Sequence, residues 1–139
     1  MSRKNFRILL VLSWLLVIAG VVVSFVTESS LPPELRAYLE RVGNAPLASG
    51  EIALAVVDVA FIILAIVLTV GLFRFRRWAR SLLLVSYVLG FALLPAHGPY
   101  VESGWESTLF YLGSLVDGVI LALVYFSPLS EVFEMNGDV

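Results

Sequence analysis

Two aspartates, Asp58 and Asp117, stand in long apolar stretches of this 139-residue chain. Acids at such positions mark proton or ion pathways, hydrogen bonds between helices, or contacts with a partner. An isolated buried carboxyl group takes up a proton rather than staying charged. These residues therefore allow three hypotheses: neutral hydrogen-bonding groups, a proton or cation relay, or a lock against the membrane helix of a partner.

Known catalytic motifs are missing around both aspartates. Intramembrane aspartyl proteases use a GxGD motif, but Val57 precedes Asp58 and Val116 precedes Asp117. The dipeptide Asp117–Gly118 is similar to the DG of membrane phosphotransferases that act on CDP-alcohols, yet the downstream acids of that motif are absent. HExxH, GxSxG, P-loop and Rossmann patterns are also absent. With no Cys and one His, the chain offers no thiolate or His-based metal site, so we expect no enzyme and no cofactor.

The composition is that of a membrane protein. The chain is 60% hydrophobic and 14% charged, whereas soluble domains carry about 25% charged residues. This leaves too little polar surface to cover a particle in water, which favours lipid as the solvent. The length fits a single small integral-membrane domain, residues 1–139, and no internal repeat or low-complexity segment is visible.

Four stretches reach the length of about 20 predominantly apolar residues that is needed to cross the hydrocarbon core. Because backbone groups in lipid must be satisfied within the segment, these stretches are predicted to be helices. We therefore predict an all-α membrane protein, a four-transmembrane-helix bundle. The predicted spans are 8–26, 52–73, 78–96 and 107–126.

Basic residues predict the orientation of the spans. All except Arg36 and Arg41 lie in the N-terminal tail or around the turn between the second and third spans. Under the positive-inside rule, both termini are then cytoplasmic. We interpret the first span as uncleaved, because its apolar stretch is longer than that of a signal peptide. The turn segment FRFRRWAR is predicted to anchor the protein by topology and by attraction to lipid headgroups. Its anchor residues are Arg74, Arg76, Arg77, Trp78 and Arg80.

The first outer loop carries a helix signal. The segment LPPELRAYLERVG, residues 31–43, opens with two prolines and ends with a glycine. Its apolar residues Leu35, Tyr38, Leu39 and Val42 share one stripe. We predict a short amphipathic helix that lies on the outer leaflet or caps the bundle, with partner docking as the alternative. The C-terminal segment 127–139 is predicted to be a frayed or surface-lying end.

Each span has one narrow face of small or polar residues. Small residues let membrane helices approach closely, and polar side chains bond across their interfaces. We therefore predict a compact bundle in which these faces converge and both aspartates point inward. A rise of about 1.5 Å per residue puts the two acids about one turn apart in depth, so a contact between them is possible but not required. The predicted intramembrane polar and packing residues are Asp58, Asp117, Ser114, Gly113, Gly118, Ser86 and Gly90.

Arginine or lysine partners for the aspartates are not expected inside the spans. Arg80 is assigned to the inner interface, and His97, followed by a glycine and a proline, is read as part of a loop. The acids should therefore hydrogen-bond hydroxyl groups on neighbouring helices, or take part in the relay or the partner contact named above.

The short basic tail, the RRWAR turn at 76–80 and the fourth span with Asp117–Gly118 together resemble small uncharacterised bacterial four-span inner-membrane proteins. In size and number of spans the chain is also similar to immunity proteins that protect bacteria from pore-forming toxins. The resemblances imply a multi-pass protein of the bacterial inner (cytoplasmic) membrane. No residue motif carries the second resemblance, so no functional residue is transferred from it.

These observations predict a non-enzymatic protein that acts by helix–helix interaction with another membrane protein or an inserting toxin, as an immunity-type or regulatory protein. The alternative is a proton- or cation-coupled small transporter or channel subunit that uses Asp58 and Asp117. A purely structural or assembly factor is the third hypothesis. The lipid bilayer is a partner in each case, a homo-oligomer is possible, and no nucleic-acid partner is expected.

Overall fold

The computed structural model describes residues 2–27, 31–43, 49–98 and 101–135. Within these ranges the regular secondary structure is helical throughout. Four helices are long and apolar enough to cross a membrane, which confirms the predicted helical structure and the predicted number of helices of membrane-spanning length. The helices are α1 (Arg3–Thr27), α2 (Pro33–Gly43), α3 (Ser49–Phe73), α4 (Arg77–Leu93), α5 (Gly104–Phe126) and α6 (Leu129–Met135), and a 3-10 helix, η2 (Leu94–His97), follows α4.

The ends of the long helices follow local signals in the sequence. Ser103 caps α5, because its side chain accepts the backbone N–H of Glu106 while the Glu106 carboxylate accepts the N–H of Ser103. This reciprocal pair is a capping box. α5 ends before Ser127 and Pro128, where proline stops the helix. α1 and α3 begin earlier than the predicted spans at 8 and 52, since the helices continue into polar residues outside the apolar runs.

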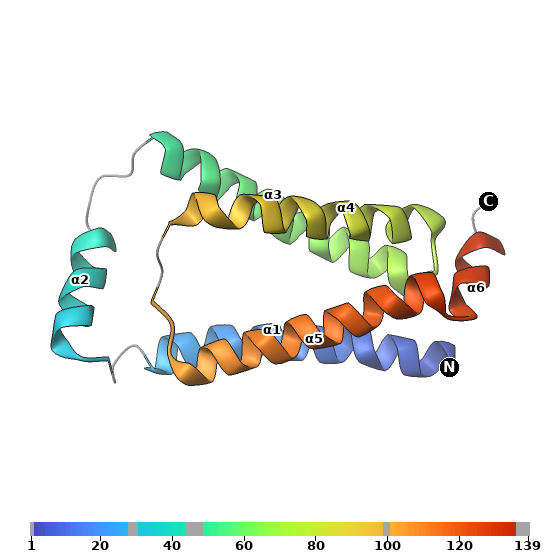
Figure 1. The fold of residues 1–139 in the computed structure, drawn as a ribbon, viewed down its shortest axis with the longest axis horizontal. Coiled ribbons are helices and arrows are strands. Elements are labelled where there is room, and N and C mark those ends of the chain that lie inside the picture. The colour runs from blue at the N-terminus through green and yellow to red at the C-terminus, as the bar shows by residue number, and fades with distance from the viewer. Residues whose placement is uncertain (1, 28–30, 44–48, 99–100, 136–139) are drawn as a thin grey trace.

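The four long helices form two antiparallel pairs. α1 packs mainly against α5, and α3 packs against α4; Figure 1 shows the pairs as two layers. Gly20 brings α1 close to α5, since a Cβ at this position would lie 3.1 Å from the Phe110 ring. The layers meet at the end that carries α6 and the α3–α4 turn, here called the closed end. The opposite end, where α2 lies, is the open end (Figure 1).

The buried core lies toward the closed end. Phe6 of α1, Phe75 of the α3–α4 turn and Phe133 of α6 meet with ring centroids between 5.2 and 6.0 Å apart. Tilted and edge-on ring contacts of this kind are favoured by the charge distribution of aromatic rings. The core joins both layers and the C-terminal helix. Its buried members are Phe6, Leu10, Leu68, Leu72, Phe75, Ala79, Leu83, Ile120, Val124, Leu129 and Phe133.

The α3–α4 turn depends on a glycine. A Cβ on Gly71 would lie 2.7 Å from Cβ of Ala79 and 2.8 Å from the Trp78 ring, closer than non-bonded carbons approach. Phe75 has a φ of 53°, in a region that few residues other than glycine adopt. Because the Phe75 side chain is only 2% exposed, its packing in the core stabilises the conformation that the turn requires.

The C-terminal segment is not a surface tail. After Pro128 the chain forms α6, and Leu129 and Phe133 are buried in the core. The prediction of a frayed or surface-lying end is therefore wrong for residues 129–135, because these two apolar side chains close the gap between α1 and the α3–α4 turn. Residues 136–139 of that prediction lie outside the described part of the chain.

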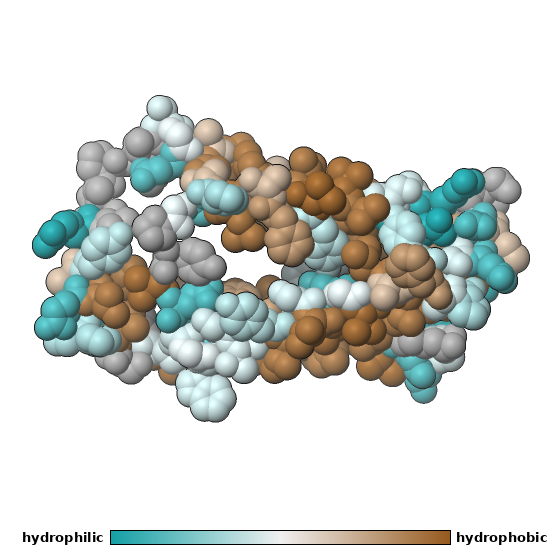
Figure 2. Space-filling view, viewed as in Figure 1, coloured by the Kyte–Doolittle hydropathy of each residue, from teal (hydrophilic) through white to brown (hydrophobic). Residues whose placement is uncertain are grey.

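The open end has no comparable core among the described residues. The first outer loop does contain a helix, α2, with Leu35 and Tyr38 exposed; its place at the membrane surface stays a prediction. A hollow separates the two layers, as the space-filling view in Figure 2 shows. The four long helices therefore form a wedge rather than the compact bundle that was predicted.

Candidate functional site

A cavity of about 480 Å³ lies between the two layers. It borders the core, because Leu10, Leu68 and Ile120 belong to both. Its volume falls within the range of about 300–1,000 Å³ that is typical of small-molecule sites. All four long helices line the cavity, mostly with apolar side chains. The residues in its lining that carry side-chain polar groups are Ser13, Trp14, Thr69, Ser86, Tyr87 and Asp117.

Asp117 faces this cavity from α5. Its Oδ1 accepts a hydrogen bond from Ser13 Oγ of α1 at 2.5 Å, and the Tyr87 hydroxyl of α4 interacts with the same carboxyl group. One acid therefore connects three helices and both layers. The structure places Asp117 inside the bundle, as predicted, with hydroxyl groups as its neighbours.

A second polar contact crosses the hollow. The indole N–H of Trp14 on α1 donates to Thr69 Oγ1 on α3 at 2.8 Å, and the Thr69 hydroxyl donates to the Ala65 carbonyl at 2.7 Å. On α4, Ser86 and Gly90 line the same cavity, as predicted for the interior. Since Ser86 Oγ donates to a carbonyl of its own helix, it contributes polarity to the wall without joining two helices.

Asp58 lies away from the cavity. Its side chain is 52% exposed, and its Oδ1 lies 3.1 Å from Nε2 of His97. The prediction that both aspartates point inward is therefore wrong for Asp58. The physical reason is the wedge shape: toward the open end α3 finds its polar partner on η2, in its own layer. His97, which was expected in a loop, ends that 3-10 helix.

The predicted small-residue patch of the fourth span is split between two faces of α5. Gly113 is buried, and a Cβ there would lie 3.9 Å from Leu16 of α1. Ser114 and Gly118 are exposed, and a Cβ on Gly118 would meet nothing within 4 Å. The prediction of one inward patch is thus wrong for these two residues, because the contact face of α5 is centred on Gly113 and Ile120 instead.

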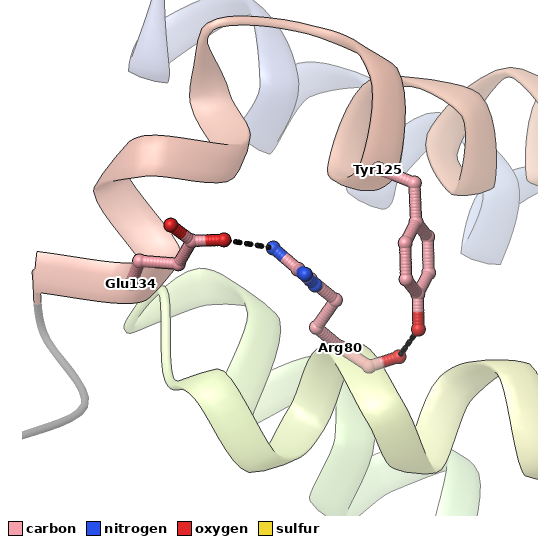
Figure 3. Close-up of polar contacts among 3 residues, drawn as sticks. All are labelled: Arg80, Tyr125 and Glu134. Carbon is pink, nitrogen blue, oxygen red and sulfur yellow. Dashed lines mark hydrogen bonds and ion pairs between the residues drawn. The ribbon is translucent and has the colours of Figure 1, made fainter.

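The arginines of the inner turn differ in their surroundings. Arg74, Arg77 and Trp78 are exposed, as an anchoring role at a membrane surface requires. Arg80 instead contacts the C-terminal part of the chain, as Figure 3 shows: its Nη1 lies 3.3 Å from Oε1 of Glu134, and its backbone carbonyl accepts the Tyr125 hydroxyl at 3.0 Å. The guanidinium also lies over the Tyr125 ring. The last predicted anchor, Arg76, precedes α4 and is partly buried.

Two cavity residues were missed by reasoning from the sequence. Trp14 and Tyr87 are not among the predicted polar and packing residues, although each carries a hydrogen-bonding group and lines the cavity. Their positions were a usable signal, because Trp and Tyr in membrane helices concentrate at the interfaces, whereas these two lie well inside α1 and α4. A buried indole N–H or phenol usually has a polar partner.

The polar groups of the cavity can donate and accept hydrogen bonds. In the described ranges no three His, Asp or Glu side chains come together as a metal site would require. The cavity offers one carboxyl group, several hydroxyl groups and aromatic rings within an apolar wall.

No family model, curated protein or solved structure matches the chain.

Proposed function

We propose that this protein is a non-enzymatic, multi-pass protein of the bacterial inner membrane that acts by binding the transmembrane helix of a partner protein. The observation that carries the proposal is an outward stripe of small residues on α5: Ser114, Gly118 and Ala122, spaced four apart, are all exposed. Glycine and serine at such spacing let a second helix approach closely enough for extensive van der Waals contact in lipid.

The surroundings of this stripe support an external partner. Tyr111 and Leu115, which flank it, are 72% and 67% exposed. The Ser114 hydroxyl donates to the Phe110 carbonyl of its own helix, so the stripe presents a flat surface without a competing polar group. Lipid alone does not require small residues at this position, whereas a packed helix does.

The proposed setting follows from the charge distribution. Arg74 and Arg77, exposed at the closed end, support a cytoplasmic position for this end and for both termini. The partner is then another inner-membrane protein or a toxin that inserts from the opposite side. A neighbouring gene for a secreted toxin would favour an immunity role, and a neighbouring membrane-protein gene a regulatory one.

Site-specific photo-crosslinking tests the proposal. Benzoylphenylalanine at Leu115, beside the stripe, should give one dominant adduct in native membranes, and Gly118→Ile should abolish it by blocking close approach. The matched control is the same label at Ile63 on α3, which is 58% exposed and outside the stripe; it should give no such adduct. Self-adducts alone, or an adduct unaffected by Gly118→Ile, would contradict the proposal.

A second candidate function is a proton- or cation-coupled transporter or channel subunit. The position of Asp117 in a cavity lined by all four spans favours it. The separation of Asp58, which pairs with His97, argues against a relay that uses both acids. Ion flux into proteoliposomes decides the matter: this candidate requires flux by the wild type that Asp117→Asn removes, and equal background rates in both proteins would exclude it.

A further inference from the structure

The cavity between the layers is a second site, independent of the outward stripe on α5. We propose that it binds a monovalent lipophilic cation, a small apolar or aromatic body around one positive charge, with Asp117 as the residue that recognises the charge.

The volume of the cavity selects a small occupant. A membrane-spanning helix is about 10–12 Å across with its side chains and about 30 Å long, several times larger than the 480 Å³ between the layers. A partner helix therefore does not fit inside without separating the pairs. The same volume lies in the lower half of the range of about 300–1,000 Å³ for small-molecule sites.

The charge of the cavity lining favours a positively charged ligand. Asp117 is the one acid in the lining, and no described Lys, Arg or His lines it. The carboxyl group accepts a hydrogen bond from Ser13 on Oδ1 and interacts with the Tyr87 hydroxyl. Because a carboxylate has about four lone-pair sites, acceptor capacity remains. A carboxyl group in a membrane interior carries its charge when a counter-charge lies beside it, and a bound cation supplies that counter-charge whereas a neutral lipid chain does not.

The remaining lining selects the body of the occupant. Trp14, Phe61, Tyr87 and Phe91 come from three different helices and all line the cavity. Aromatic rings attract cations through their quadrupoles, most strongly for Trp and most strongly in desolvated sites. The rest of the wall is apolar, which favours hydrocarbon or aromatic substituents over a hydrated inorganic ion. An anion of the same shape would be repelled by the charge of Asp117 and would gain no cation–π attraction from the rings. We therefore expect that the cavity does not bind it.

Two ions of the same shape and opposite charge test this inference. Purified protein in nonionic detergent should bind tetraphenylphosphonium saturably at one site, measured by equilibrium dialysis against protein-free micelles. Tetraphenylborate should neither bind at that site nor displace the cation. Because this comparison needs no variant, it holds even if substitutions in the cavity impair folding. Equal binding of the two ions, or no saturable binding of the cation, would overturn the inference.

Substitutions then locate the site. Asp117→Asn, nearly identical in shape, should weaken cation binding at least about tenfold, as expected for loss of a charged contact. Trp14→Leu should weaken binding by a smaller factor. Asp58→Asn is the matched control, since this acid lies outside the cavity, and it should leave binding unchanged. An equal loss in the Asp58 and Asp117 variants would overturn the assignment.

The cation-binding experiment and the photo-crosslinking experiment can fail independently of each other. If the cation fails to bind while the Leu115 adduct still forms and still depends on Gly118, the cavity inference fails alone. If a lipid co-purifies in the cavity and tetraphenylphosphonium does not displace it, the inference also fails. Binding of the cation in a protein that gives no adduct would leave the cavity as a site and remove the proposed partner helix.

Discussion

The closed end and the open end are made from the same four helices but are held in different ways. At the closed end, Phe6 and Phe133 have no exposed surface, and the core joins both layers. Toward the open end, Phe25 and Phe91 are 76% and 69% exposed, and the polar contacts Asp58–His97 and Thr27–Ser103 connect neighbours within one layer.

This difference shows what positions helices in a membrane. Lipid tails are as apolar as leucine, so apolar composition alone gives helices no preference for one another over lipid. Close packing provides that preference, and here it depends on shape: Gly71 admits Ala79 and Trp78, and the aromatic rings interlock. Where shape does not fit, the layers separate and leave a cavity.

The largest effect is expected from opening the closed end. Phe133→Ala should lower the free energy of unfolding in detergent by about 3–5 kcal/mol, because a buried ring is removed from a packed core. Phe126→Ala is the matched control: this phenylalanine is 91% exposed, and its loss should change stability by less than about 0.5 kcal/mol. Similar losses in the two variants would show that the aromatic core does not hold the layers together.

A smaller loss is expected from the α3–α4 turn. Gly71→Ala places a methyl group against Ala79 and Trp78, and overpacking of this kind costs about 1–3 kcal/mol. Gly118→Ala, where the added methyl group meets nothing within 4 Å, should be tolerated. Thermal unfolding of both variants measures the difference, and an unaffected Gly71→Ala protein would contradict the close approach at the closed end.

The polar contact between α1 and α5, which lie in the same layer, should contribute less again. In a double-mutant cycle with Ser13→Ala and Asp117→Asn, we expect a coupling energy of about 0.6 kcal/mol, the average for interhelical hydrogen bonds in membranes. The cycle, measured by unfolding in detergent, isolates the contact of these two side chains. A coupling energy of zero would show that Ser13 and Asp117 act independently, and that packing alone joins α1 to α5 at this level.

The smallest effect is expected at the open end. Asp58→Asn alters the contact with His97, in which the Asp58 side chain is 52% exposed, and exposed polar pairs contribute little. We expect no measurable change in unfolding free energy. A clear loss of stability would mean that the Asp58–His97 pair holds α3 to η2 more strongly than its exposure indicates, and would weaken the contrast between the two ends.

Much of the fold was predictable because it depends on short segments. Apolar runs of the right length predict the spans. The predicted fourth span begins at 107, whereas α5 begins at Gly104, next to the capping pair Ser103 and Glu106. The site was only partly predictable. Among the predicted interior residues, Asp117, Ser86 and Gly90 line the cavity. Asp58, Ser114 and Gly118 were predicted on the same grounds and do not line it.

The reason for this limit lies in the geometry of helix packing. Periodicity places residues on a common face, yet several faces of an apolar helix look alike when the solvent is lipid. The choice among them depends on side chains far away in sequence, as when Ser13 meets Asp117 or Trp14 meets Thr69. Trp14 and Tyr87 carried no distinguishing pattern beyond their depth in the spans.

The sequence by itself therefore determined that the chain is helical, that four of its helices are long and apolar enough for a membrane, and which few polar residues lie among them, because length and hydropathy are local properties. Only the tertiary structure decided that α1 pairs with α5 and α3 with α4, that α6 closes one end, and that Asp117 rather than Asp58 faces the cavity. Those outcomes depend on the fit of distant surfaces, which no single segment encodes.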